Sequence, residues 1–113
     1  MKKEDLKLSG LPACYGEAVG TVVFVRSQDD LVKVDEQSIV VTDKLTSEYT
    51  EAYIKAAGVI TQTGGVTCHA AIVCREYQTP CIVSCRECFD VFQEGESIEI
   101  DSKLLLAKLL NKN

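Results

Sequence analysis

The sequence lacks several features that would assign it to particular classes of protein. It has no tryptophan, one methionine, two prolines and a single histidine in 113 residues. No apolar run approaches the roughly 20 residues that a membrane-spanning helix needs, so no membrane role is expected. Twelve Lys and Arg residues stand scattered against seventeen Asp and Glu residues, for a net charge of −5. Since binding of a phosphate backbone requires clustered basic residues, nucleic acid is not an expected partner.

Cysteine, in contrast, is abundant, and the spacing of the six cysteines helps to decide whether they form disulfides or a zinc site. Only Cys85 and Cys88 form a C-x-x-C pair, and a structural zinc site normally needs a second pair or further histidines. We therefore expect reduced, mostly buried thiols in a cytoplasmic protein, and no metal site. A thiol or zinc protein built on Cys81, Cys85 and Cys88 is the alternative. The cysteines are Cys14, Cys68, Cys74, Cys81, Cys85 and Cys88.

The order of apolar segments predicts an α/β fold in a single domain spanning 1–113, with helices packed on a core sheet. Gly16 and Gly20 are expected in turns. The C-terminal KLLLAKLL fits either a strand or a short helix. Apolar, β-branched runs predict strands at Thr21–Arg26, Ser38–Thr42, Gly58–Thr61, Pro80–Ser84 and Ser97–Asp101.

Two segments have helical signatures. The first is capped by Thr46 or Ser47 and ends before Gly58. Its apolar stripe is formed by Tyr49, Ala52, Tyr53 and Ala56. The second begins near Thr67 and ends before Pro80, because proline disfavours helical geometry in the preceding residue.

The lone histidine, His69, lies in TQTGGVTCHAAIVCRE, between a predicted strand and the second helix. The first N–H groups of a helix lack internal partners and carry partial positive charge, so an anion is stabilised there. Gly64 and Gly65 have no side chains that would block an anion from approaching the helix N-terminus. Thr67 and Cys68 add a hydroxyl and a thiol at the same end of the helix. A neutral imidazole can attack phosphorus near pH 7, so His69 is a candidate phosphoryl carrier. The alternative is a partly buried histidine with no chemical task.

The stretch GGVTCHAAIVCRE, followed by TPCIV, closely resembles the phosphohistidine signature of the phosphoenolpyruvate-utilising enzymes. This family includes phosphoenolpyruvate synthase, pyruvate phosphate dikinase, rifampicin phosphotransferase and the first enzyme of the bacterial sugar phosphotransferase system. GLPACYGEAVG, IVVTDKLTSEY, KAAGVIT and EGESIEID resemble other family segments, so the resemblance covers nearly the whole chain.

The resemblance implies a swivelling β/β/α phosphohistidine domain. His69 would be the phosphoryl acceptor, supported by Gly64, Gly65, Thr67 and Cys68. The phosphoryl group would move between an ATP-grasp nucleotide-binding domain and a pyruvate/phosphoenolpyruvate-binding domain. This chain shows neither partner domain, so it would be a phosphotransferase component that is incomplete alone. Mg²⁺ and ATP or phosphoenolpyruvate would bind at the partner sites, with no cofactor held by this chain.

Some positions depart from the family pattern. Cys74 replaces an alanine, Tyr77-Gln78 replaces Leu-Gly, and Ser84 and Ser102 replace glycines. Glu94-Gly95 replaces an Asp-Gly. These changes are expected to affect turns and helix termination more than chemistry. Arg75 and Glu76 match the family but lie about two turns beyond His69, so a solvated pair or a tie to a neighbouring loop is expected.

A binding or regulatory module that keeps the anion site without catalysis is the alternative function.

Overall fold

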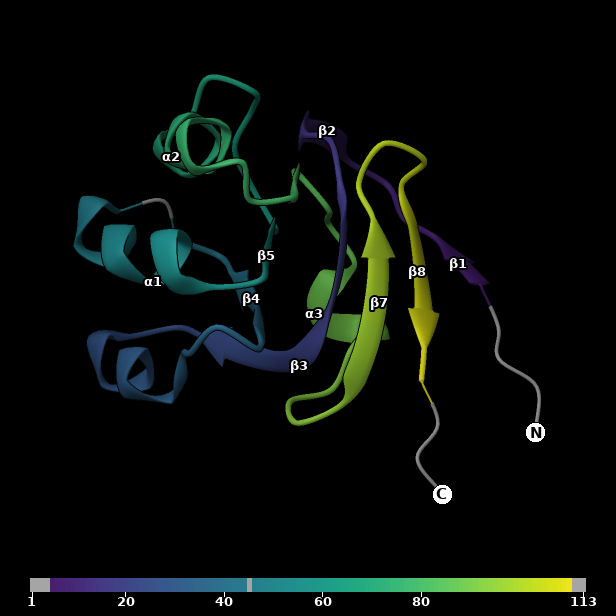
Figure 1. Ribbon diagram of the computed structural model, residues 1–113, viewed down its shortest axis with the longest axis horizontal. Helices are drawn as coiled ribbons and strands as arrows, with labels where there is room; N and C mark the ends of the chain where they lie inside the picture. The colour runs from purple at the N-terminus through teal and green to yellow at the C-terminus, as the bar shows by residue number, and fades with distance from the viewer. Residues whose placement is uncertain (1–4, 45, 111–113) are drawn as a thin grey trace.

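The computed structural model describes residues 5–44 and 46–110; residues 1–4, 45 and 111–113 of the expected domain lie outside the described residues. Within the described ranges, eight strands form one sheet in the order β1-β8-β7-β3-β4-β5-β6-β2 (Figure 1). The strands are β1 Asp5–Lys7, β2 Leu11–Cys14, β3 Glu17–Val25, β4 Ser38–Thr42, β5 Gly58–Thr61, β6 Cys81–Val83, β7 Ser97–Asp101 and β8 Leu106–Leu109. The helices are α1 Thr50–Lys55, α2 His69–Tyr77 and α3 Cys88–Val91, with 3₁₀ turns η1 Gln28–Lys33 and η2 Ser47–Tyr49.

The centre of the sheet is parallel and the flanks are antiparallel. Strands β3, β4, β5 and β6 run parallel, whereas β7, β8, β1 and β2 pair antiparallel to their neighbours. Every residue of β4, β5 and β6 is buried. Continuous runs of Val and Ile suit such strands because both faces are covered. The predicted α/β fold class is therefore confirmed.

The sheet curls so that its two edge strands come close in space. Strands β1 and β2 occupy opposite edges of the sheet, yet only Leu8, Ser9 and Gly10 separate them along the chain. Gly10 has φ +115°, and a Cβ there would lie 2.6 Å from the carbonyl oxygen of Val83. Only glycine fits this crossing without strain.

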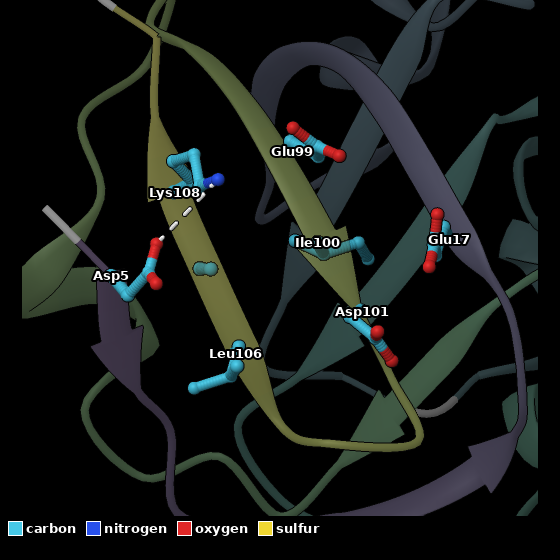
Figure 2. A pocket seen from close by; sticks show the side chains of 8 residues that line it. Asp5, Glu17, Glu99, Ile100, Asp101, Leu106 and Lys108 are labelled. Carbon is cyan, nitrogen blue, oxygen red and sulfur yellow. Dashed lines mark ion pairs between the residues drawn. The ribbon is translucent and has the colours of Figure 1, made fainter. Parts of the chain in front are cut away.

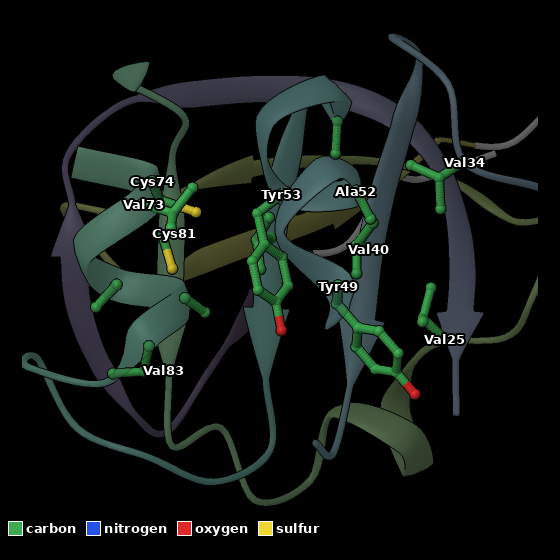
Figure 3. Close-up of a cluster of buried hydrophobic side chains, with 14 of the residues drawn as sticks. Val25, Val34, Val40, Tyr49, Ala52, Tyr53, Val73, Cys74, Cys81 and Val83 are labelled. Atoms are coloured by element: carbon green, nitrogen blue, oxygen red, sulfur yellow. The ribbon is translucent and has the colours of Figure 1, made fainter. Parts of the chain in front are cut away.

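Two apolar clusters fill the two sides of the curled sheet. The first cluster lies inside the curl, between strands β3 to β6 on one side and β7, β8 and α3 on the other. Its buried side chains include Ile39, Val41, Ile60, Phe92, Ile98 and Ile100. On the outer face, α1 and α2 cover the sheet, and Figure 3 shows Tyr49, Tyr53, Val73, Cys74 and Cys81 in this second cluster. Side chains alternate between the clusters along a strand: Val40 and Val59 face the helices, whereas Val41 and Ile60 face inward. The resulting layers, sheet on sheet with helices outside, match the expected β/β/α arrangement.

The predicted elements need few corrections. Strands β4, β5 and β7 have the predicted bounds, and β6 is shorter by one residue at each end. β3 begins at Glu17, so the expectation of a turn at Gly20 was wrong. A Cβ on Gly20 would lie 2.5 Å from the carbonyl oxygen of Gln37, so close backbone approach explains this glycine. In the ambiguous C-terminal segment, a turn leads into strand β8, which covers only Leu106–Leu109.

The helices also follow the prediction closely. The side chain of Thr46 accepts a hydrogen bond from the N–H of Glu48, which confirms it as a cap, although the first turn is 3₁₀. All members of the predicted apolar stripe are buried: Tyr49, Ala52, Tyr53 and Ala56. No helix within 5–44 and 46–110 is long and apolar enough to cross a bilayer.

Candidate functional site

The site lies where β5 leads through a loop into α2. His69 is the first residue of α2, two residues later than the predicted start, because Cys68 has extended backbone angles and serves as the N-cap. Gly64 has φ +99°, a conformation that favours glycine. The carbonyl of Gly65 accepts a hydrogen bond of 3.0 Å from the N–H of Cys68, which closes a turn directly before the helix. The predicted residues therefore meet at one loop–helix junction.

This helix terminus has the features of an anion site. The N–H of Ile72 donates to the carbonyl of Cys68 at 3.0 Å. The N–H groups of His69, Ala70 and Ala71 come before this first α-helical bond, where the helix dipole leaves partial positive charge. A Cβ added at Gly65 would meet no atom within 4 Å, so the approach to the turn is open. A phosphoryl group beside His69 would be stabilised by this arrangement.

The imidazole of His69 is held by α1, which sequence reasoning missed. The Oγ1 of Thr50 lies 2.7 Å from Nε2 of His69. The ring of Tyr53, buried one turn further along α1, lies 6.3 Å from the imidazole centre at an interplanar angle of 56°. His69 itself is half-buried. Thr50 carries no sequence signal of its own, since the contact joins two helices through tertiary packing.

The hydrogen bonds of Thr50 define the resting tautomer of His69. Oγ1 of Thr50 also lies 2.6 Å from the carbonyl oxygen of Ser47. A carbonyl can only accept, so the single hydroxyl hydrogen of Thr50 goes to Ser47 when both bonds are made. Nε2 of a neutral His69 then carries the proton and donates to Oγ1, which leaves the lone pair on Nδ1.

Thr67 and Cys68, the two residues before His69, differ in their exposure to solvent. Thr67 is exposed. Cys68 is half-buried and packs against the apolar cluster beneath the helices. The hydroxyl is therefore accessible to solvent, whereas much of the thiol faces protein.

Arg75 and Glu76 do not approach the imidazole. Nη1 of Arg75 donates to the carbonyl oxygen of Ala13 at 3.1 Å, which ties α2 to the edge strand β2. Glu76 is exposed. Arg75 thus makes a tie to a neighbouring part of the chain, although its partner lies in a strand and not in the expected loop.

The cysteines form no disulfide, as expected for reduced thiols. A hydrogen bond with Cys74, followed by burial, raises the pKa of Cys81, and Cys85 acts in the same way on the pKa of Cys88. Burial and the neighbouring Cys74 also raise the pKa of Cys14. These thiols are therefore protonated at neutral pH. In the described part of the chain, no three Cys, His, Asp or Glu side chains form a group that could hold a metal ion.

Two of the surface hollows among the described residues do not include His69 in their lining. One, of 130 Å³, lies on the β1, β8, β7 and β3 part of the sheet (Figure 2). Its lining includes Asp5, Glu17, Glu99 and Asp101, with Lys108 3.9 Å from Asp5. The excess of carboxylates disfavours a phosphoryl group there. The other, of 290 Å³, lies between η1 and α1 and includes Thr50. Neither exceeds the roughly 300 Å³ at which small-molecule pockets begin.

Comparisons with known proteins identify the family of the chain. The family model described as the mobile domain of PEP-utilising enzymes, where PEP is phosphoenolpyruvate, matches residues 34–104. The chain belongs to this family. The probable phosphoenolpyruvate synthase of Methanothermobacter thermautotrophicus is 39% identical over 101 residues, which cover 89% of this chain and 15% of that protein. The phosphoenolpyruvate synthase of Pyrococcus furiosus is 34% identical, with coverage of 89% and 12%. This mobile domain thus corresponds to a small part of each relative.

Solved structures support the fold of the mobile domain. The solution structure of an Enzyme I protein aligns with a TM-score of 0.59 at 22% identity, covering 74% of this chain and 34% of that one. Aconitase X of Thermococcus kodakaraensis aligns with a TM-score of 0.62 at 17% identity, covering 96% and 99%. At these identities the likeness concerns the fold alone.

Proposed function

We propose that this mobile domain is a phosphoryl carrier and that His69 is its phosphoryl acceptor. The observation that carries the proposal is the position of the lone histidine at the open N-terminus of α2, behind Gly64 and Gly65, in a chain of this family. Gly64 has the left-handed backbone of the turn, Gly65 leaves space beside it, Cys68 is the N-cap of the helix, and Thr67 is exposed two residues before His69.

The proposed reaction has two transfers. A ring nitrogen of His69 uses its lone pair to form an N–P bond, while the bond from phosphorus to the oxygen of the leaving group breaks. The second transfer reverses these changes with the acceptor as nucleophile. The N–H groups at the start of α2 stabilise the phosphoryl charge between the transfers.

Thr50 sets a condition for the first transfer. In the resting state, Nε2 carries a proton and contacts Oγ1 of Thr50. For Nε2 to attack, the proton moves to Nδ1 through water and the ring rotates away from Thr50. The contact therefore holds the imidazole in one orientation until a donor arrives.

The proposed transfers need a donor site and an acceptor site, which partner domains would supply. We infer that an ATP-grasp nucleotide-binding domain and a pyruvate/phosphoenolpyruvate-binding domain provide the donor and acceptor sites. These sites would also bind Mg²⁺ with ATP or phosphoenolpyruvate, and Mg²⁺ would offset the charge that develops during transfer. Both substrates are cytoplasmic metabolites, so we place the function in the cytoplasm.

A labelling experiment tests the proposal. The partner is the Methanothermobacter phosphoenolpyruvate synthase in which the residue that aligns with His69 is changed to alanine. With that partner and labelled ATP or phosphoenolpyruvate, we expect an acid-labile, base-stable phosphate on the mobile domain. His69→Ala should abolish the label, and Cys68→Ala should retain it. Undiminished labelling of His69→Ala would contradict the role of His69. Binding of phosphate without any covalent adduct would instead support an anion-binding module.

A further inference from the structure

Three cysteines from three different elements meet in the apolar cluster beneath the helices. Cys14 is the last residue of β2, Cys74 lies on α2, and Cys81 is the first residue of β6. Cys74 and Cys81 are buried members of this cluster, lie next to each other in it (Figure 3), and make a thiol–thiol hydrogen bond. Cys14 packs against the same cluster. The carrier chemistry uses none of these thiols, and the family pattern has alanine in place of Cys74.

The pairing of β2 with β6 sets Cys14 opposite Cys81. After a shift in register between Pro12 and Cys14, the two cysteines are partners in this antiparallel pair. Opposed residues of antiparallel strands have Cα atoms about 4.5–5.5 Å apart, and a disulfide needs about 4.4–6.8 Å. Both side chains belong to the helix side of the sheet, because Cys14 packs against the cluster that contains Cys81. The strand pairing therefore gives the two residues a spacing that a disulfide accepts.

The two thiols differ in their access to solvent. Cys14 is half-buried, whereas Cys81 is fully buried. An oxidant in solution therefore meets Cys14 first, and Cys81 reacts with a group that is already inside the protein. Burial and Cys74 raise the pKa of Cys14, and the charge of Arg75 opposes this in part. Since the thiolate is the reactive form, Cys14 reacts slowly and stays reduced until the oxidant is abundant.

We propose that Cys14 and Cys81 are a reversible oxidation site, which forms a disulfide when the protein meets a hydroperoxide. The thiolate of Cys14 attacks one oxygen of the O–O bond, which breaks. The products are a sulfenic acid on Cys14 and an alcohol, or water when the oxidant is hydrogen peroxide. The sulfur of Cys81 then attacks the sulfur of Cys14, the S–O bond breaks, and the hydroxyl group leaves with the thiol proton as water. The two thiols lose two electrons in total, and the O–O bond accepts them.

This disulfide would fasten one edge of the sheet. Among the described strands, β2 lies at the end of the sheet order and pairs with β6. The bond would close a loop of chain from residue 14 to residue 81, which restricts the unfolded state and so stabilises the fold. Disulfides that form in reducing compartments are usually transient, and thiol exchange reverses them. The site thus makes the stability of the fold depend on the oxidant.

Peroxide treatment of the full chain followed by peptide mapping tests the proposal. Reduced protein is treated with hydrogen peroxide, the remaining thiols are blocked after unfolding in urea, and the peptides are identified by mass spectrometry. We expect each molecule to lose two hydrogens and to yield a peptide pair joined through Cys14 and Cys81, which dithiothreitol separates. The test variant is Cys14→Ser. The matched control is Cys68→Ser, which changes the other half-buried cysteine, at the N-cap of α2 and outside the strand pair.

The bond should be absent from Cys14→Ser and should form in Cys68→Ser at the rate of the unchanged chain. The oxidised chain should also unfold at a higher urea concentration than the same sample after dithiothreitol. A bond between other cysteines, such as Cys74 and Cys81, would overturn the proposal. A Cys14 that ends as a sulfinic acid, or that remains a thiol while free cysteine in the same solution is oxidised, would also overturn it. His69→Ala should form the same bond, so the result does not depend on the proposed carrier function.

Discussion

At the scale of single residues, the contact between Thr50 and His69 sets the state of the imidazole. Thr50→Val removes the hydroxyl but keeps the size of the side chain, so Nε2 loses its acceptor. We expect ¹⁵N chemical shifts of neutral His69 to show the Nε2–H tautomer in the unchanged chain and a mixture in Thr50→Val. Thr50→Ser keeps the hydroxyl and should resemble the unchanged chain. Identical ring shifts in all three proteins would contradict the contact.

The cysteines give a second test at this scale. Cys14 and Cys68 are half-buried, whereas Cys74, Cys81, Cys85 and Cys88 are fully buried. At pH 8, a thiol-reactive dye should modify only the first two in the folded protein, and slowly at Cys14 because burial raises its pKa and lowers its thiolate fraction. The other four should react after unfolding in urea. Rapid modification of all six without denaturant would contradict the packing.

At the scale of elements, two positions that depart from the family pattern have left-handed backbone angles. Gln78 ends α2 with φ +59°, and Ser84 follows β6 with φ +60°. Both stand where the pattern has glycine, and a side chain is strained in this region. From the sequence, these two residues were expected to affect turns and the end of a helix. The positive φ angles give the physical reason, because a side chain is unfavourable in this conformation.

Gln78→Gly should therefore stabilise the protein. Relief of the left-handed strain is expected to raise the free energy of unfolding by about 1 kcal/mol. Glu76→Gly, inside α2, should lower the free energy of unfolding by a similar amount, because glycine is unfavourable there. Urea denaturation measures both. A loss of stability in Gln78→Gly would show that the side chain contributes more than the strain removes.

The crossing between β1 and β2 predicts a dependence of stability on pH. The hydroxyl and N–H of Ser9 donate to the carboxylate of Glu87, the latter at 2.8 Å. The hydroxyl and then the N–H of Ser9 hold the pKa of Glu87 below its ordinary value of 4.5. A lowered pKa in the folded state stabilises the protein above that ordinary value. This stabilisation disappears as the pH falls through the folded pKa.

Glu87→Gln should accordingly lower stability at pH 7 by less than about 1 kcal/mol, since the pair is largely exposed. The difference from the unchanged chain should shrink as the pH falls below 4.5 and through the folded pKa of Glu87. Thermal unfolding over a series of acidic pH values measures this, with the exposed Glu36→Gln as control. A difference that stays constant as the pH falls would contradict the role of the charge.

The limits of sequence reasoning are also clearest for elements. Val- and Ile-rich runs identified β4 and β5 because both faces of central strands are apolar, and the alternation of apolar and polar residues identified β7. The short β1, β2, η1 and α3 have too few residues for a periodic signal. The loop–helix junction was predicted from Gly64, Gly65 and His69, which are adjacent in sequence. Thr50 was missed because only tertiary packing brings it to the imidazole.

At the scale of the whole molecule, the curled sheet separates two surfaces. The helix face carries His69 and exposed apolar residues, whereas the β1, β8 and β7 part of the sheet carries an acidic hollow. The net charge of −5 disfavours phosphate binding on the acidic parts of this surface. Among the described residues, the proposed anion site and the acidic hollow thus lie on different parts of the fold.

Reversible transfer is the central claim, and a chase experiment tests it most directly. The mobile domain is labelled at His69 from phosphoenolpyruvate through the synthase partner, purified, and returned to fresh partner with excess unlabelled pyruvate. The account predicts that the label leaves the protein as phosphoenolpyruvate, and that His69→Ala carries no label at any stage. Release of the label only as inorganic phosphate, or label that stays on the protein in the presence of partner and pyruvate, would contradict a carrier.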